Sequence, residues 1–232
     1  MLVVSRVKEV QELLAVTTEL PRLSTEQFVE RYGSGPRREW AAAVYQAMLQ
    51  EAERLSRPGS LYAEYSLEEV QALVPWLPQG SLAVVLGLCT RGFEVEKRIR
   101  ELFEDEAPSA VVLDEICLAL VGAMARQIHR TVRRRAEEGG LHAGPPYRPG
   151  LGHWPLEAQR TLFARLPAQE IGVSLSANLV MKPAKTTSLI IPLLAKRKSY
   201  QERYMAEKGE YGLKEESSSK LRHMLGTESV QT

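Results

Sequence analysis

The chain has 232 residues, with 30 Lys and Arg against 29 Asp and Glu and 44% hydrophobic residues, a composition typical of a soluble globular protein of about one domain to one and a half. A formal charge of +1 gives no global field that would attract nucleic acid or an anionic membrane. Only two residues are cysteines and only two of the acids are aspartates, which argues against disulfide scaffolds, calcium loops and a built-in metal site.

The first third of the chain is predicted to be helical. Residues 4 to 15 are amphipathic, and Ser24 to Gln27 has the pattern of a helix start with a capping box. A longer helix is predicted from Arg37 to Ser56. Its expected buried stripe, spaced by three and four residues, consists of Trp40, Val44, Ala47 and Met48.

Two strands and a long helix are predicted next. Leu61 to Leu67 alternates apolar and polar residues and indicates an edge strand, while Leu82 to Leu88 is a continuous apolar run that indicates a central strand. After the turn at Thr90 to Gly92, a helix is expected to begin near Phe93. A long helix from Ala107 to Gly139 has an apolar face made by Leu113, Ile116, Leu120, Ala123 and Ile128.

The segment from Leu141 to Pro155 is too rich in glycine and proline to predict regular structure, and long loops of this kind are often functional. A helix is expected from Pro155 to about Leu166. Short strands should follow at Ile171 to Leu175, Leu179 to Met181 and Thr187 to Leu194. We therefore expect one domain over residues 1–195, with 1–60 as its helical N-terminal part, and a loosely ordered polar tail over 196–232.

The side chains of the glycine-rich loop suit a binding site. Arg148 carries a planar fork of donors that fits a carboxylate, and Gly150 and Gly152 let the backbone approach a ligand closely. His153 and Trp154 add rings that stack or form hydrogen bonds. The residues alone are equally consistent with a rigid surface turn whose arginine pairs with a glutamate.

Two motifs point to a family. Arg148 to Pro155 reads RPGLGHWP, and the segment from Gly172 to Ser188 follows a short helix. Together they resemble the activation domain of cobalamin-dependent methionine synthase and its stand-alone relatives, which carry an Arg-Pro-x-x-Gly-Tyr-x-x-x-Pro loop and a Gly-[VIM]-x-Leu-Thr-Glu-Ser-x-x-Met-x-Pro segment. The positions that match the second motif are Gly172, Val173, Leu175, Ser176, Met181, Pro183, Thr186, Thr187 and Ser188. The resemblance covers roughly Leu82 to Pro192.

The resemblance implies an α/β (α+β) fold, with an antiparallel sheet flanked by long helices and a shallow site for S-adenosylmethionine. It implies that Arg148 binds the methionine carboxylate, that the backbone of Gly150, Leu151 and Gly152 lines the ligand, and that His153 takes the place of the family's loop tyrosine. No residue would act as a catalytic acid or base, because the cofactor performs the chemistry.

The implied partners follow from the same resemblance. Cobalamin would be carried only by a partner, either a corrinoid protein or a methionine synthase that lacks its own activation domain. The protein would help to restore an oxidised, inactive corrinoid, and a flavodoxin-type donor would supply the electron. No apolar run approaches the ~18 residues that span a bilayer, and the N-terminus becomes charged too early for a secretory signal, so a cytoplasmic location is expected.

Departures from the family pattern leave an alternative open. His153 replaces the loop tyrosine, Ala177 replaces a glutamate of the second motif, and Gly122 lies where the long helix often has a glutamate. The alternative is a non-catalytic interaction module of the same fold that has lost the ligand site and either docks on a corrinoid protein or forms a homodimer. A nucleic-acid binder that uses the arginines from Arg126 to Arg135 is the least favoured function, because the overall charge is neutral.

Three further polar residues have simple structural explanations. Cys89 follows an apolar strand without a Cys/His signature and is predicted to be a buried thiol. Asp114 lies in the first turns of the long helix, where a carboxylate interacts favourably with the helix dipole. His129, between Arg126 and Arg130, is predicted to be solvated.

Overall fold

The structure is a computed structural model that describes residues 11–12, 30, 35 and 37–195. The predicted helix start at Ser24 and the predicted tail over 196–232 lie outside the described residues, as does the amphipathic segment 4 to 15 apart from residues 11–12. The architecture below is that of the described part alone.

Within the described residues, five strands form one antiparallel sheet in the order β1-β2-β3-β7-β4. The strands are β1 (Gln11–Glu12), β2 (Gly59–Ser66), β3 (Ser81–Thr90), β4 (Leu141–Ala143) and β7 (Thr186–Ala195). The apolar run of β3 is central, as predicted, because both faces of the sheet are covered there. The α+β fold class is confirmed.

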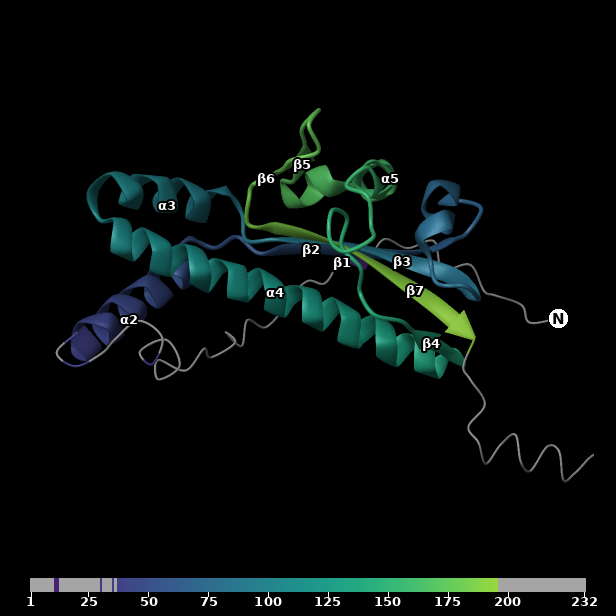
Figure 1. Cartoon of the computed structure of the whole chain (residues 1–232), viewed down its shortest axis with the longest axis horizontal. Coiled ribbons are helices and arrows are strands. Elements are labelled where there is room, and N and C mark those ends of the chain that lie inside the picture. The colour runs from purple at the N-terminus through teal and green to yellow at the C-terminus, as the bar shows by residue number, and fades with distance from the viewer. Residues whose placement is uncertain (1–10, 13–29, 31–34, 36, 196–232) are drawn as a thin grey trace, which may run out of the picture. The chain divides into compact units, whose positions relative to one another are not determined.

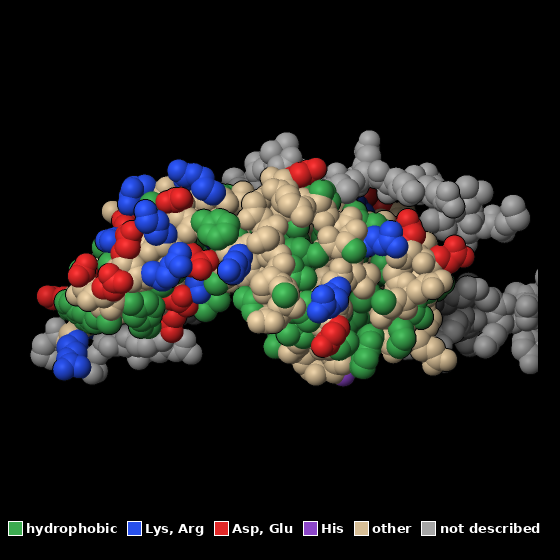
Figure 2. Space-filling model, turned by 90° about the horizontal axis from the view of Figure 1, so that it is seen from above, with side chains coloured by type: hydrophobic (Ala, Val, Ile, Leu, Met, Phe, Trp, Pro, Cys, Tyr) green, Lys and Arg blue, Asp and Glu red, His purple; other side chains and the backbone are tan. Residues whose placement is uncertain are grey.

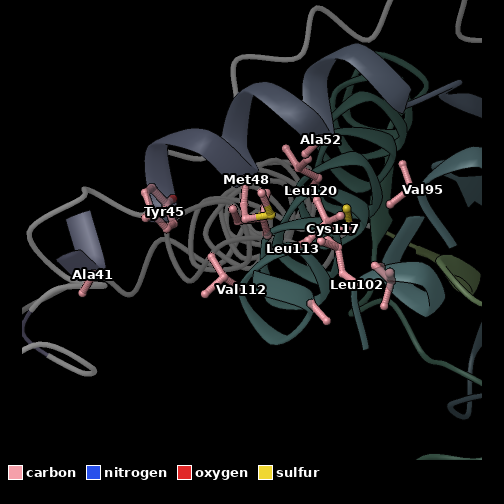
Figure 3. Packing of buried hydrophobic residues seen from close by; sticks show 13 residues of the cluster. Ala41, Tyr45, Met48, Ala52, Val95, Leu102, Val112, Leu113, Cys117 and Leu120 are labelled. Atoms are coloured by element: carbon pink, nitrogen blue, oxygen red, sulfur yellow. The ribbon is translucent and has the colours of Figure 1, made fainter. Parts of the chain in front are cut away.

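Three helices pack together, and the longest of them also lies along one face of the sheet (Figure 1). They are α2 (Arg37–Leu55), α3 (Phe93–Asp105) and the long α4 (Ala107–Glu138). The first half of α4 packs with α2 and α3, with Leu113, Cys117 and Leu120 of α4 in this cluster (Figure 3). The second half of α4 packs on the sheet through Met124, Ile128 and other residues. The helix therefore links a helical end of the domain to the sheet.

The opposite face of the sheet carries shorter elements (Figure 1). They are α5 (Ala158–Arg165), the 3-10 helices η1 (Gln71–Trp76) and η2 (Ala168–Ile171), and a hairpin of β5 (Ser174–Leu175) and β6 (Met181–Lys182). Leu86 and Ile190 of the sheet pack there against Trp154 and Leu162. Both faces of the sheet are thus buried.

One described helix, α4, has the length and apolar composition of a membrane span. Half of its most apolar window is buried inside the domain, and the buried residues contact α2, α3 and the sheet. This packing accounts for the buried apolar residues of α4, whereas Val111 and Leu118 are exposed.

The predicted stripe of α2 is confirmed at Met48, which is buried, and in part at Val44, which is half-buried against the same cluster, but it is wrong at Trp40 and Ala47. Trp40 is 53% exposed and Ala47 is exposed, whereas the buried residues are Ala41, Tyr45, Met48 and Ala52. Both sets have helical spacing, so the period was predictable. The phase is fixed by the side of α2 that meets α4, which the local pattern does not encode.

The segment from Leu141 to Pro155 is more regular than predicted. Its first residues form β4 against β7, and the Gly144 N–H then donates to the Pro192 carbonyl at 2.8 Å. The long outer edge of β7 needs partners for its backbone groups, and this segment supplies them despite its composition. The strand β2 was predicted to lie at the edge of the sheet. This prediction is wrong, because β1 pairs with β2 on its outer side.

The predicted elements after the loop exist but are displaced or shorter. The helix begins at Ala158 rather than Pro155, and the strand predicted from Ile171 is reduced to Ser174–Leu175 after the turn of η2. The strand predicted at Leu179 begins at Met181, since Leu179 has a φ of 61° and belongs to the hairpin turn. The last predicted strand matches β7.

Candidate functional site

The position of Arg148 is set by a backbone pairing just before it. The Tyr147 N–H donates to the Ile190 carbonyl at 2.8 Å, and the Ile190 N–H donates to the Tyr147 carbonyl at 2.9 Å. The Tyr147 ring packs on the α5 side of the sheet. Because successive side chains of an extended chain point to opposite faces, Arg148 leaves on the α4 side, where it is exposed.

A closed turn follows Arg148. The Leu151 N–H donates to the Arg148 carbonyl at 3.1 Å, the Gly150 N–H to the Trp154 carbonyl at 3.0 Å, and the Trp154 N–H to the Leu151 carbonyl at 3.2 Å. Gly150 and Gly152 have φ angles of 83° and 62°, a conformation that glycine adopts without strain. The sequence-predicted residues from Gly150 to His153 thus lie together on one exposed turn.

Rings anchor this turn. The centroid of the Tyr147 ring lies 5.2 Å from that of Trp154 and 5.7 Å from that of His153. Trp154 is buried in the core on the α5 side, whereas His153 is exposed. The ring of His153 is therefore available to a ligand while Trp154 holds the turn in place.

Helix α4 faces the turn, and His129 fixes their relative position. Its Nε2 lies 2.9 Å from the Gly144 carbonyl oxygen and His129 is partly buried, so the prediction of a solvated histidine is wrong. Gly122 is on the same face two turns earlier, about 10 Å along the axis. From Gly144 to Tyr147 the loop advances along β7 from Pro192 to Ile190, two strand residues or about 7 Å, in the direction that leads back along α4 toward Gly122. Arg148 therefore lies between the levels of His129 and Gly122 along α4.

The charge of Arg148 also acts on a buried thiol beside α4. Burial raises the pKa of the Cys89 thiol to about 12, and the guanidinium groups of Arg148 and Arg91 act in the opposite direction. Cys89 Sγ lies 3.8 Å from the carbonyl oxygen of Val121, the neighbour of Gly122. Arg148 thus acts electrostatically on the point where β3 meets α4. Cys89 is a buried, neutral thiol, as predicted.

Arg91 is a buried arginine that the sequence did not reveal. Its side chain is buried, with 2% exposure, and burial lowers its pKa. Its Nε donates to Ser56 Oγ at 3.1 Å and its Nη1 to Met124 Sδ at 3.9 Å. Within residues 37–195 no carboxylate forms an ion pair with it. A lone arginine in a predicted turn carries no sequence signal of such burial.

Arg148 also has no ion-pair partner among the described carboxylates. The alternative of an arginine tied to a glutamate in a surface turn is not what the described residues form. An exposed guanidinium on a fixed turn is instead free to bind the carboxylate of a ligand.

The end of the second motif is joined to α3 and α4 by polar contacts. Lys185, which precedes β7, pairs with Asp114 of α4 at 2.5 Å, and the Ala184 N–H donates to Glu96 of α3 at 2.7 Å. Asp114 thus has a specific partner beyond the helix dipole that was predicted. The tip of the motif, with Ala177, is exposed on the β5–β6 hairpin, on the sheet face opposite to α4 (Figure 1).

A hollow between α2 and α3 is lined by charged residues. Glu51 binds Arg98 at 2.8 Å and Arg54 at 3.2 Å, and Glu101 lies 3.6 Å from Arg98 and 3.9 Å from Lys97. Figure 2 shows the intermixed positive and negative side chains at this end of the domain. Because these charges neutralise one another, the hollow is a weaker candidate than the turn at Arg148.

Comparison with known proteins supports the fold. No protein-family model and no curated protein matches the sequence. Among solved structures, the chain is similar to the MetH reactivation domain bound to AdoHcy, with a TM-score of 0.59 and 15% identity, over 87% of this chain and 86% of that one. At this identity the likeness establishes the shared fold.

Proposed function

We propose that the protein binds S-adenosylmethionine at the Arg148 turn and supports the reductive methylation of an inactive corrinoid on a partner protein. The observation that carries the proposal is an exposed arginine without an acidic partner among the described residues, held on a glycine turn beside α4. The similarity to a reactivation domain bound to AdoHcy is consistent with it.

The proposed roles of the residues follow from their chemistry. Arg148 binds the carboxylate of the methionine part through its planar donors. The backbone from Gly150 to Gly152 lines the ligand, and the exposed ring of His153 stacks on it or donates to it. The chain orients the methyl donor and needs no acid or base of its own.

The proposed partner carries the corrinoid. When bound to that partner, cobalamin accepts one electron and the methyl group of S-adenosylmethionine, which leaves methylcobalamin and S-adenosylhomocysteine. The partner is either a corrinoid protein or a methionine synthase without its own activation domain. A flavodoxin-type protein supplies the electron, and the reaction takes place in the cytoplasm.

Isothermal titration calorimetry with S-adenosylmethionine tests the ligand claim. Arg148→Ala should weaken binding by roughly 10- to 150-fold, because a hydrogen bond to a charged group contributes about 1.5–3 kcal/mol. Arg160→Ala is the matched control, since Arg160 is exposed on α5, across the sheet from α4. Equal affinity of the parent and Arg148→Ala, or no binding to the parent at millimolar ligand, would overturn the proposal.

The alternative function is an interaction module without a ligand. Exposed apolar side chains favour it, because Leu151 on the turn is 60% exposed and Leu118 on α4 is 52% exposed. It predicts that a corrinoid protein is captured equally well by the parent and by Arg148→Ala, and less well by Leu118→Ser. Sedimentation velocity of the chain alone reports self-association.

A further inference from the structure

We infer that the site selects its ligand by charge and that Arg126 determines this specificity. Arg126 acts with Arg148 on the space over Gly122, so that S-adenosylhomocysteine, which has no net charge, binds more tightly than S-adenosylmethionine, which has one net positive charge. The inference rests on the proposed function, because it concerns the same ligand site.

The side chain of Arg126 lies over Gly122, which has no side chain of its own. A Cβ atom added at Gly122 would lie 3.4 Å from Arg126 Nη1, so the guanidinium extends back over the glycine one turn before it. Since Arg148 lies between the levels of His129 and Gly122, and Arg126 lies between these two residues on α4, both guanidinium groups lie along the same stretch of the helix. Arg126 is exposed and forms no ion pair with a described carboxylate.

The described elements around this space contain no acid to balance the two arginines. Neither Asp nor Glu occurs in α4 from Ile116 to Ala136, in the chain from Gly139 to Leu156, in β3 or in β7. The nearest acids along α4 are Asp114 and Glu115, about 10–12 Å from Gly122, and Asp114 already pairs with Lys185 at 2.5 Å. The buried Arg91, beside Cys89, adds a third positive charge.

This charge distribution treats the parts of the ligand differently. It favours the carboxylate and disfavours the ammonium and sulfonium groups. S-adenosylhomocysteine and S-adenosylmethionine share the carboxylate and the ammonium group and differ by the methyl group and its sulfonium charge. The part of their affinity ratio that changes with the residue at position 126 therefore reports the charge. A unit charge about 6–8 Å from Arg126, at an effective dielectric constant of about 40–80, changes affinity by roughly two- to tenfold.

Calorimetry with both ligands tests the inference. The parent should bind S-adenosylhomocysteine roughly two- to tenfold more tightly than S-adenosylmethionine. Arg126→Ala should reduce this ratio, Arg126→Glu should invert it, and Arg126→Lys should preserve it because the charge is kept. Arg134→Ala, an exposed arginine three turns beyond Gly122 on α4, should leave the ratio unchanged. Higher salt should also reduce the ratio.

The outcomes separate the two proposals. If neither ligand binds the parent, the proposed function fails. If both ligands bind but the parent prefers S-adenosylmethionine, or if the ratio is the same in the parent, Arg126→Ala and Arg126→Glu, the inference about Arg126 is overturned while the proposed function stands. Circular dichroism of each variant checks that a changed ratio does not come from unfolding.

Discussion

Replacing Trp154 by phenylalanine tests how the Arg148 turn is held in place. Trp154 is 3% exposed and packs in the core on the α5 side of the sheet. Its Nε1 is buried without a hydrogen-bond partner among the described residues. A buried donor that lacks a partner costs about 1–3 kcal/mol, and phenylalanine removes the donor while keeping most of the ring.

Two effects of opposite sign set the magnitude. The smaller ring gives up about 40 Å² of apolar contact, which corresponds to about 1 kcal/mol. Removal of the unpartnered donor returns about 1–3 kcal/mol. Trp154→Phe should therefore leave the free energy of unfolding unchanged or raise it by up to about 2 kcal/mol. Trp154→Ala removes nearly the whole side chain and should lower it by about 3–5 kcal/mol.

Urea denaturation followed by far-ultraviolet circular dichroism measures these changes without relying on tryptophan fluorescence. Trp40→Phe is the control, because Trp40 is 53% exposed on α2 and its replacement should change the stability by less than about 0.5 kcal/mol. A loss of more than about 2 kcal/mol in Trp154→Phe would refute the reasoning, since it would mean that Nε1 has a hydrogen-bond partner.

Three further predictions concern stability. Asp114→Asn should lower the free energy of unfolding by about 1–3 kcal/mol, because it leaves the largely buried Lys185 charge without its partner. Chemical denaturation of single variants at Asp114 and at Lys185, and of the double variant, measures the interaction energy of the pair. Gly144→Ala should lower the free energy of unfolding by about 1–3 kcal/mol, since the added Cβ would lie 2.8 Å from the ring of Pro192 in β7. Gly139→Ala is the control, because its nearest contact would be at an ordinary 3.5 Å. Equal losses of stability in the two variants would contradict this prediction. The pKa of Cys89 is raised by burial from its ordinary 9.0 to about 12, so between these values the folded chain binds more protons than the unfolded chain, and stability should fall as the pH rises through that range. The melting temperatures of the parent and of Cys89→Ala should therefore differ less at pH 10 than at pH 7.

The fold was predictable where the sequence pattern is long or continuous. The apolar run of β3 and the 32 residues of α4 leave little choice of structure. The position of β2 inside the sheet was not predictable, because it depends on the two residues of β1 in a segment with a helical pattern. The buried side of α2 likewise depends on its contact with α4, and Trp40 and Tyr45 fit helical stripes equally well.

The site was predictable only in part. Arg148 and the glycines that follow are adjacent in sequence, so one local pattern reveals the turn. Arg126 and His129 come to the same place from α4 because of tertiary packing, and their surroundings in sequence are those of a solvated basic helix. Arg91 is positioned by the end of β3 against α2 and α4, which no local pattern indicates.

Amide chemical shifts of the ¹⁵N-labelled full chain, titrated with S-adenosylmethionine, test the central claim most directly. The account predicts that the largest changes occur at Gly150, Leu151 and Gly152, with further changes at Gly122 on α4. It would be contradicted if these amides stayed unchanged at millimolar ligand, or if the changes clustered instead around Glu51 and Arg98 in the hollow between α2 and α3.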